Sequence, residues 1–138
     1  MLRKAECCCG SCSIEVNAEP VIYGVCHCND CKKRTGSAFG LSSYFKNENI
    51  SNLKGETLLY KVQNDNGNQE RHFCSKCGST LFWYADIFNS LTGVAGGCFI
   101  DKPLPQPSFT TMNENKCNWV ALSKEMETSF TAEDIPNA

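Results

Sequence analysis

This sequence lacks an excess of charge, a long apolar run and a recognisable leader segment. Its 13 basic and 15 acidic side chains give a net charge of −2, which provides no overall attraction to nucleic acid or to an anionic membrane surface. No apolar run approaches the roughly 18 residues that a membrane-spanning helix needs. Residues 1–6 lack the apolar stretch of a signal peptide. We therefore expect a cytoplasmic protein with neither nucleic acid nor membrane as a partner.

Internal repeats, low-complexity segments and long helical periods are also missing. The length of 138 residues fits one domain, and we expect a single domain over residues 1–138 with a loose C-terminal tail at about 131–138. Short runs of alternating, β-branched and aromatic residues, separated by turn residues, predict strands. These strands are expected at 13–16, 21–25, 37–45, 58–62, 79–84 and 91–100, with a late strand or anchoring segment at 119–122.

The segments between these strands carry turn signals. Residues 29–36 are expected to form a turn or one helical turn, and residues 63–68 a loop of almost pure turn composition. Prolines punctuate residues 101–107, which can hardly be regular structure. The predicted fold class is mainly β, with short antiparallel sheets and few short helical turns.

Cysteine, in contrast, is abundant: the chain has 11. In a small secreted protein such a number would indicate a disulfide framework. The count is odd, however, and thiols separated by one or two residues are poorly placed to bridge distant parts of a fold. We therefore expect reduced thiols that bind metal in a reducing compartment.

Seven well-spaced thiols lie in three short clusters at tight turns. Such spacing lets one loop present two or more thiolates to one metal, and zinc takes four nitrogen or sulfur ligands in a tetrahedron. Seven thiols suit one closed site with four ligands and one open site with three. The three-thiol cluster is the natural open site, but spacing alone leaves a ribbon-like pairing of Cys28 and Cys31 with Cys74 and Cys77 possible. The clusters are Cys7-Cys8-Cys9-Gly10, Cys26-His27-Cys28-x-x-Cys31 and Cys74-x-x-Cys77-Gly78.

The order of these clusters resembles one known family. The first cluster, the segment Cys26–Ser37 (C-H-C-x-x-C-K-K-R-T-G-S) and the segment Arg71–Ser79 (R-x-F-C-x-x-C-G-S) are similar to the glutathione-dependent formaldehyde-activating family, which includes centromere protein V-like domains. The resemblance extends over about residues 7–122. It implies a zinc-stapled, mostly β "tent" with two Zn²⁺ ions per chain. The implied ligands are Cys7, Cys9, Cys74 and Cys77 for a structural zinc, and Cys26, Cys28 and Cys31 for a catalytic zinc.

The activity implied by the resemblance is that of a zinc-dependent carbon–sulfur lyase, which joins glutathione and formaldehyde into S-(hydroxymethyl)glutathione. The chemistry of three thiolates favours the same class. With Zn²⁺ such a site has a net charge of about −1, which suits a soft fourth ligand better than a water to be acidified. We hypothesise that glutathione or a related thiol binds there as a thiolate and adds to, or leaves, a carbonyl carbon. The alternatives are a non-catalytic zinc-binding module and a thiol redox enzyme of similar β architecture.

Five residues that follow the second cluster are candidate substrate contacts. Lys32, Lys33 and Arg34 form a basic run that could attract an anionic thiol such as glutathione and pair with its carboxylates. Gly36 and Ser37 could offer hydrogen-bond donors at a pocket wall. A solvated turn followed by the start of a strand is the alternative interpretation.

The two histidines, the remaining cysteines and the aromatic residues discussed below are expected to have mostly structural roles. His27 is expected in the core or behind the metal ligands, because successive side chains point apart, and His72 on a strand. Cys8 and Cys12 depart from the family pattern and could act as alternative ligands. Small buried apolar residues are expected at Cys98 and Cys117, and core aromatic residues at Phe82, Trp83, Phe99 and Trp119.

Overall fold

Two β-sheets form the framework of the computed structural model, which describes residues 1–64 and 67–126. The smaller sheet has three antiparallel strands in the order β1-β2-β5. Its strands are short, and the mainly β fold class predicted from the sequence is confirmed. They are β1 (Arg3–Glu6), β2 (Ser13–Val16) and β5 (Ile50–Lys54).

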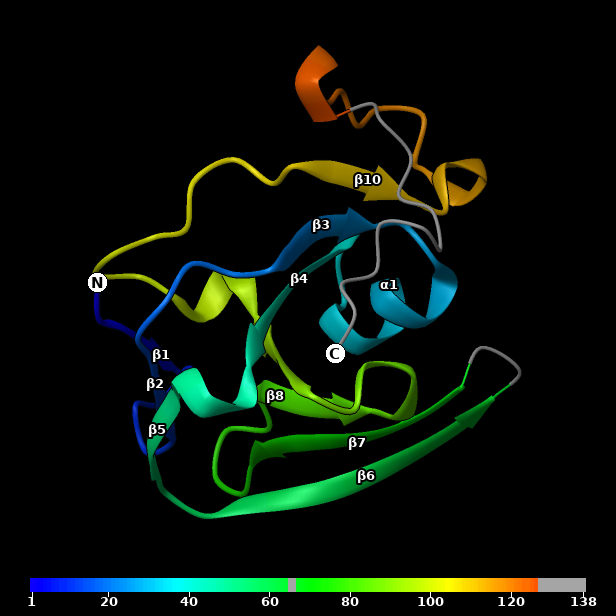
Figure 1. Cartoon of the computed structure of the whole chain (residues 1–138). Coiled ribbons are helices and arrows are strands. Elements are labelled where there is room, and N and C mark those ends of the chain that lie inside the picture. Colours follow the sequence, from blue (N-terminus) through cyan, green and yellow to red (C-terminus); the bar gives the residue numbers. More distant parts are fainter. Residues whose placement is uncertain (65–66, 127–138) are drawn as a thin grey trace.

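The larger sheet has seven strands in the order β10-β3-β4-β9-β8-β7-β6 (Figure 1). Neighbouring strands are antiparallel except β10 and β3, which are parallel, so the expectation of purely antiparallel sheets does not hold at this edge. The strands are β3 (Ile22–Cys26), β4 (Gly40–Lys46), β6 (Thr57–Asn64), β7 (Gly67–Cys74), β8 (Thr80–Ala85), β9 (Leu91–Ala95) and β10 (Phe109–Thr111).

The segment between β3 and β4 forms the helix α1 (Asn29–Thr35) rather than a single turn. The Cys28 side chain caps its N-terminus by accepting a hydrogen bond from the backbone N–H of Cys31. Gly36 ends the helix with a left-handed φ of 66°, a conformation that glycine adopts without steric cost. Because α1 follows β3 directly, all three cysteines of the second cluster lie at this strand–helix junction.

Five short 3₁₀ helices connect other elements of the described chain. They are η1 (Asn47–Asn49), η2 (Asp86–Phe88), η3 (Gly96–Cys98), η4 (Asn113–Asn115) and η5 (Lys124–Met126). Within residues 1–64 and 67–126, no helix has the length and apolar character needed to cross a membrane.

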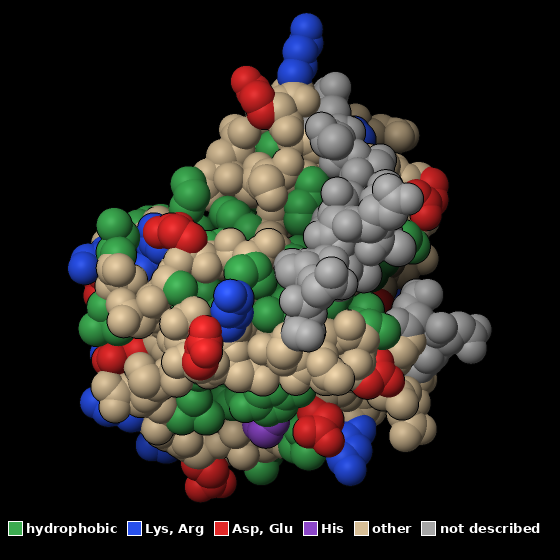
Figure 2. All heavy atoms as spheres, in the orientation of Figure 1, with side chains coloured by type: hydrophobic (Ala, Val, Ile, Leu, Met, Phe, Trp, Pro, Cys, Tyr) green, Lys and Arg blue, Asp and Glu red, His purple; other side chains and the backbone are tan. Residues whose placement is uncertain are grey.

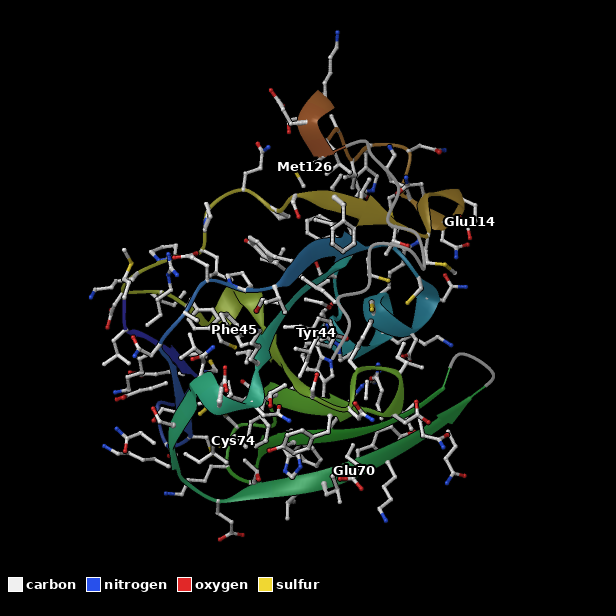
Figure 3. All side chains as sticks on the ribbon, in the orientation of Figure 1. Tyr44, Phe45, Glu70, Cys74, Glu114 and Met126 are labelled. Carbon is white, nitrogen blue, oxygen red and sulfur yellow. The ribbon has the colours of Figure 1, made fainter. Side chains whose placement is uncertain are left out.

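The core has two parts that lie on opposite faces of β4. Phe45 has no exposed surface and packs with apolar residues of β1 and β2, between the two sheets. Tyr44 packs on the other face with Trp83 and Phe88, at centroid distances of 6.0 and 4.8 Å. Figure 3 shows these two adjacent side chains on either side of the strand. The alternation arises because successive side chains of a strand point to opposite faces.

Several sequence-based boundaries were wrong. Of the expected loop at 63–68, residues 63, 64, 67 and 68 belong to the β6–β7 ladder, and residues 65 and 66 lie outside the described residues. The expected strand at 91–100 stops at Ala95 and continues as η3. Residues 119–122 form no strand, and Trp119 is 77% exposed rather than in the core. Residues 101–107 are irregular, as predicted. The predicted tail at 131–138 lies outside the described residues.

Candidate metal centres and the adjoining cavity

Four cysteines from two distant loops converge at one end of the molecule. The Sγ atoms of Cys7, Cys9, Cys74 and Cys77 all lie within 4.8 Å of one another. The first two come from the β1–β2 loop and the last two from the β7–β8 turn, which a backbone hydrogen bond from Gly78 to Cys74 closes at 2.9 Å. Four sulfur donors at such distances are the ligand set of a closed structural zinc site.

Several sulfur atoms of this four-thiol cluster accept hydrogen bonds from nearby donors. The backbone N–H of Cys12 donates to Cys7 Sγ at 3.2 Å, and that of Lys76 donates to Cys74 Sγ at 3.4 Å. Hydrogen bonds with Ser79 lower the pKa of Cys77 to about 5. Donors aimed at sulfur stabilise the thiolate, which is the form that binds a metal.

Cys8 and Cys12 lie beside this cluster without belonging to it. Cys12 is fully buried, and its Sγ donates to the backbone oxygen of Glu56 at 3.2 Å. Burial raises the pKa of Cys12, so its thiol stays protonated. Cys8 is exposed, and its backbone N–H donates to Ser79 Oγ at 3.1 Å, which ties the two loops together. Neither takes the place of a predicted ligand in the described structure.

The second group consists of Cys26, Cys28 and Cys31, whose Sγ atoms also lie within 4.8 Å of one another. They sit at the end of β3, at the N-cap of α1 and in its first turn. Hydrogen bonds from Cys26 and then Cys31 lower the pKa of Cys28 to about 2, and the same contact with Cys28 raises the pKa of Cys26. Three sulfur atoms this close together are a donor set that a soft divalent cation binds as thiolates. The ribbon-like pairing with Cys74 and Cys77 does not occur.

Both histidines lie outside the thiol groups, as predicted. His27 is completely buried, and its Nε2 lies 3.0 Å from Thr110 Oγ1. Because that hydroxyl donates to Asn113 Oδ1, Nε2 is the donor toward Thr110. His72 lies on β7 and stacks on Phe82 at a centroid distance of 4.5 Å. Their roles are packing and positioning.

A cavity of about 420 Å³ opens beside the three-thiol group. Cys26, Cys28 and Cys31 border it on one side. The remaining walls come from strands β3, β4, β7, β8 and β10, the helix α1 and the 3₁₀ helix η2, and Tyr44 points from β4 toward this space (Figure 3). Three sulfur donors thus face a space large enough for a small organic molecule, whereas the four-thiol cluster would supply all four ligands of a tetrahedral metal by itself.

Residues 2–115 match the model of a protein family described as "Glutathione-dependent formaldehyde-activating enzyme". The chain belongs to this family. A protein of Halomonas elongata described as "Putative glutathione-dependent formaldehyde-activating enzyme" is 30% identical over 139 aligned residues, which cover 94% of this chain and 87% of that protein. The crystal structure of a Rhodobacter sphaeroides protein is similar in fold, with a TM-score of 0.54 at 20% identity, and covers 70% of this chain and 86% of its own.

Of the five substrate contacts expected for this member of the glutathione-dependent formaldehyde-activating family, Arg34 borders the cavity. Lys32 instead donates to the backbone oxygen of Asn115, and Gly36 caps α1. Lys33 and Ser37 are exposed and are not among the residues that border the cavity. Successive side chains of α1 point in different directions, and only one side of this helix faces the cavity. Arg34 lies on that side, whereas Lys32 and Lys33 do not border the cavity.

Sequence reasoning assigned no role to an ion pair at the cavity, between the buried Arg71 and the half-exposed Asp30. Arg71 on β7 pairs with Asp30 on α1 and donates from Nε to Gln69 Oε1 at 3.2 Å. All three residues border the cavity. Arg71 is the first residue of the R-x-F-C motif that contributes to the family resemblance. Its place in that motif is the sequence feature that could have indicated a role for it. The pair fixes α1, and with it the three-thiol group, to the larger sheet.

Proposed function

We propose that this protein is a carbon–sulfur lyase that adds glutathione, or another small thiol, to a small carbonyl compound, as in the formation of S-(hydroxymethyl)glutathione. The observation that carries the proposal is the opening of the three-thiol group onto a cavity that also contains an uncompensated arginine. The family membership supports the same reaction.

The sulfur-only donor sets fit zinc at both sites. We assign a structural zinc to Cys7, Cys9, Cys74 and Cys77, and a catalytic zinc to Cys26, Cys28 and Cys31. The second ion would supply a soft Lewis acid with a free coordination position, which favours the thiolate form of a thiol. The 11 cysteines are all free thiols, which supports the assignment of the protein to a reducing compartment such as the cytoplasm.

Arg34 is the residue that we assign to the reacting oxygen. Its Nη2 is buried and has no hydrogen-bond partner, although a buried unpaired donor is costly. The guanidinium lies over the Trp83 ring at 4.7 Å, which fixes its orientation. A Cβ on Gly40 would lie 2.7 Å from Arg34 Nη2 and 3.3 Å from Cys31 Sγ, so both atoms flank this glycine. The unpaired donor therefore lies next to the three-thiol group.

The proposed step uses this donor where negative charge develops. The thiolate sulfur attacks the carbonyl carbon and forms the new C–S bond, while the π electrons of C=O move to oxygen. Arg34 donates a hydrogen bond to that oxygen, and the proton released by the thiol returns to it through solvent. Preorganised donors at a developing oxyanion contribute about a hundredfold or more to the rate.

The test measures glutathione–formaldehyde exchange by NMR with zinc-loaded protein. We expect acceleration over the uncatalysed rate, about two zinc ions per chain by elemental analysis, and a loss of about a hundredfold in kcat for Arg34→Gln. Lys61→Gln removes the same charge from an exposed site on β6 and should leave the rate unchanged. If the wild-type protein does not accelerate the exchange, the proposed enzyme activity is refuted. If Arg34→Gln keeps the wild-type rate, only the role assigned to Arg34 is refuted.

A further inference from the structure

The cavity walls away from the three-thiol group are apolar. Trp83 and Phe88 line it, as do Ile22 on β3 and Phe109 on the edge strand β10. Two further apolar side chains, Ile87 and Met112, border the cavity although they are 57% and 38% exposed. On the face shown in Figure 2, hydrophobic side chains gather between the upper and lower parts of the molecule. Exposed apolar side chains that surround a concave site indicate an apolar ligand.

Two of the aromatic rings lie close against glycines of the neighbouring strands. Phe109 on β10 is directly opposite Gly24 on β3, and a Cβ there would lie 2.3 Å from the ring. Trp83 on β8 is opposite Gly93 on β9, where a Cβ would lie 2.2 Å from the indole nitrogen. Side chains at these two positions would displace the rings, so the glycines define the shape of the cavity walls.

The cavity offers few unpaired charged groups to a strongly polar ligand. Its charged lining residues are Asp30, Arg34 and Arg71. Asp30 and Arg71 pair with each other, so Arg34 is the one cation not neutralised within this lining. Glutathione has two carboxylates and several amides, and formaldehyde has a single carbon. Neither reactant alone complements a wall of aromatic and aliphatic side chains.

We infer that the carbonyl substrate carries an apolar body, such as an alkyl chain of about five carbons or an aromatic ring, which lies against Phe109, Phe88 and Ile87. This inference rests on the proposed function and specifies its carbonyl reactant. The reaction is the addition described above: the C–S bond forms, the C=O π bond opens, and the thiol proton ends on oxygen. The product is the hemithioacetal of a larger aldehyde.

The first experiment compares straight-chain aldehydes from formaldehyde to hexanal with glutathione, using zinc-loaded protein. The readout is kcat/KM divided by the uncatalysed rate constant of each aldehyde, which removes their different intrinsic reactivity. We expect this ratio to rise at least tenfold along the series, since each methylene buried in an apolar pocket adds several-fold discrimination. A flat or falling series overturns the inference while leaving the proposed lyase in place.

The second experiment measures binding without turnover. The chain has two tryptophans, so Trp119→Phe leaves Trp83 as the fluorescent reporter in the cavity wall. Hexanamide, an unreactive relative of hexanal, should change the Trp83 emission saturably at a concentration at least tenfold below any effect of formamide. Phe109→Ala should weaken this binding severalfold, whereas Leu59→Ala, on exposed β6, should not. Equal responses to both amides, or none, overturn the inference.

Discussion

Replacing Gly55 by alanine tests whether the connection between β5 and β6 holds the four-thiol cluster in place. Gly55 has a φ of +89°, and a Cβ there would lie 2.1 Å from the backbone oxygen of Ser11 and 2.8 Å from both Cα and Sγ of Cys12. The neighbours at 2.1 and 2.8 Å include backbone atoms, so no side-chain rotation relieves the contact. Cys12 donates its N–H to Cys7 Sγ, and the displacement therefore reaches a predicted metal ligand.

The expected loss of folding free energy has two contributions. The left-handed backbone of a residue with a Cβ costs about 1–2 kcal/mol. Overpacking against a rigid neighbour adds about 1–3 kcal/mol. We therefore expect Gly55→Ala to lower the free energy of unfolding by about 2–5 kcal/mol. For a chain of this length each kcal/mol corresponds to a Tm change of about 3–5 °C.

The matched control is Gly36→Ala. Gly36 also has a positive φ, +66°, but a Cβ there would meet nothing within 4 Å, so this variant should lose only the backbone contribution of about 1–2 kcal/mol. The assay is urea unfolding of both zinc-loaded variants in reducing buffer, with zinc release by chelator measured in parallel. Gly55→Ala should also release zinc from the four-thiol cluster faster than Gly36→Ala. Equal stabilities of the two variants would refute the steric argument.

Four further substitutions probe the core and the two candidate metal centres. Phe45→Ala removes a fully buried ring and should lower the free energy of unfolding by about 3–5 kcal/mol in urea. Tyr44→Phe leaves the buried N–H of Trp83, now donated at 3.0 Å, without its acceptor, and should cost about 1–3 kcal/mol by the same assay. Cys28→Ser should lose one of the two expected zinc ions with little change in circular dichroism, whereas Cys77→Ser should lose zinc and much of the folded signal; elemental analysis distinguishes the two. Equal effects of both serine variants would contradict the division into a structural and an open site.

The positions of the thiols could be anticipated because their spacing is local. Cys28 and Cys31 are separated by one helical turn, so the three-thiol group follows from the strand–helix junction alone. The convergence of Cys7 and Cys9 with Cys74 and Cys77 is a long-range property, and spacing left a different pairing open. The family resemblance, rather than the residues by themselves, provided that pairing, and the structure groups the same four sulfurs.

The cavity could not be predicted, because its walls depend on strand register. The pairs Trp83–Gly93 and Phe109–Gly24 join segments whose order in the sheet is not encoded in any local pattern. The parallel pairing of β10 with β3 was missed for the same reason. Trp119 was expected in the core from its size and apolar character alone, but its segment forms no strand and leaves it exposed. Burial of one aromatic residue is a tertiary property that its type does not decide.

The two thiol groups differ in how early they can assemble while the chain is synthesised. Cys26, Cys28 and Cys31 can come together as soon as α1 has formed, within a single short loop. Cys9 and Cys74 are 65 residues apart in sequence, and closing that loop costs about 2 kcal/mol more in chain entropy than closing the short one. The three-thiol group can therefore assemble in an incomplete chain, whereas the four-thiol cluster forms only after the β7–β8 turn has been made. Assembly of the four-thiol cluster would therefore report that the β7–β8 turn has formed.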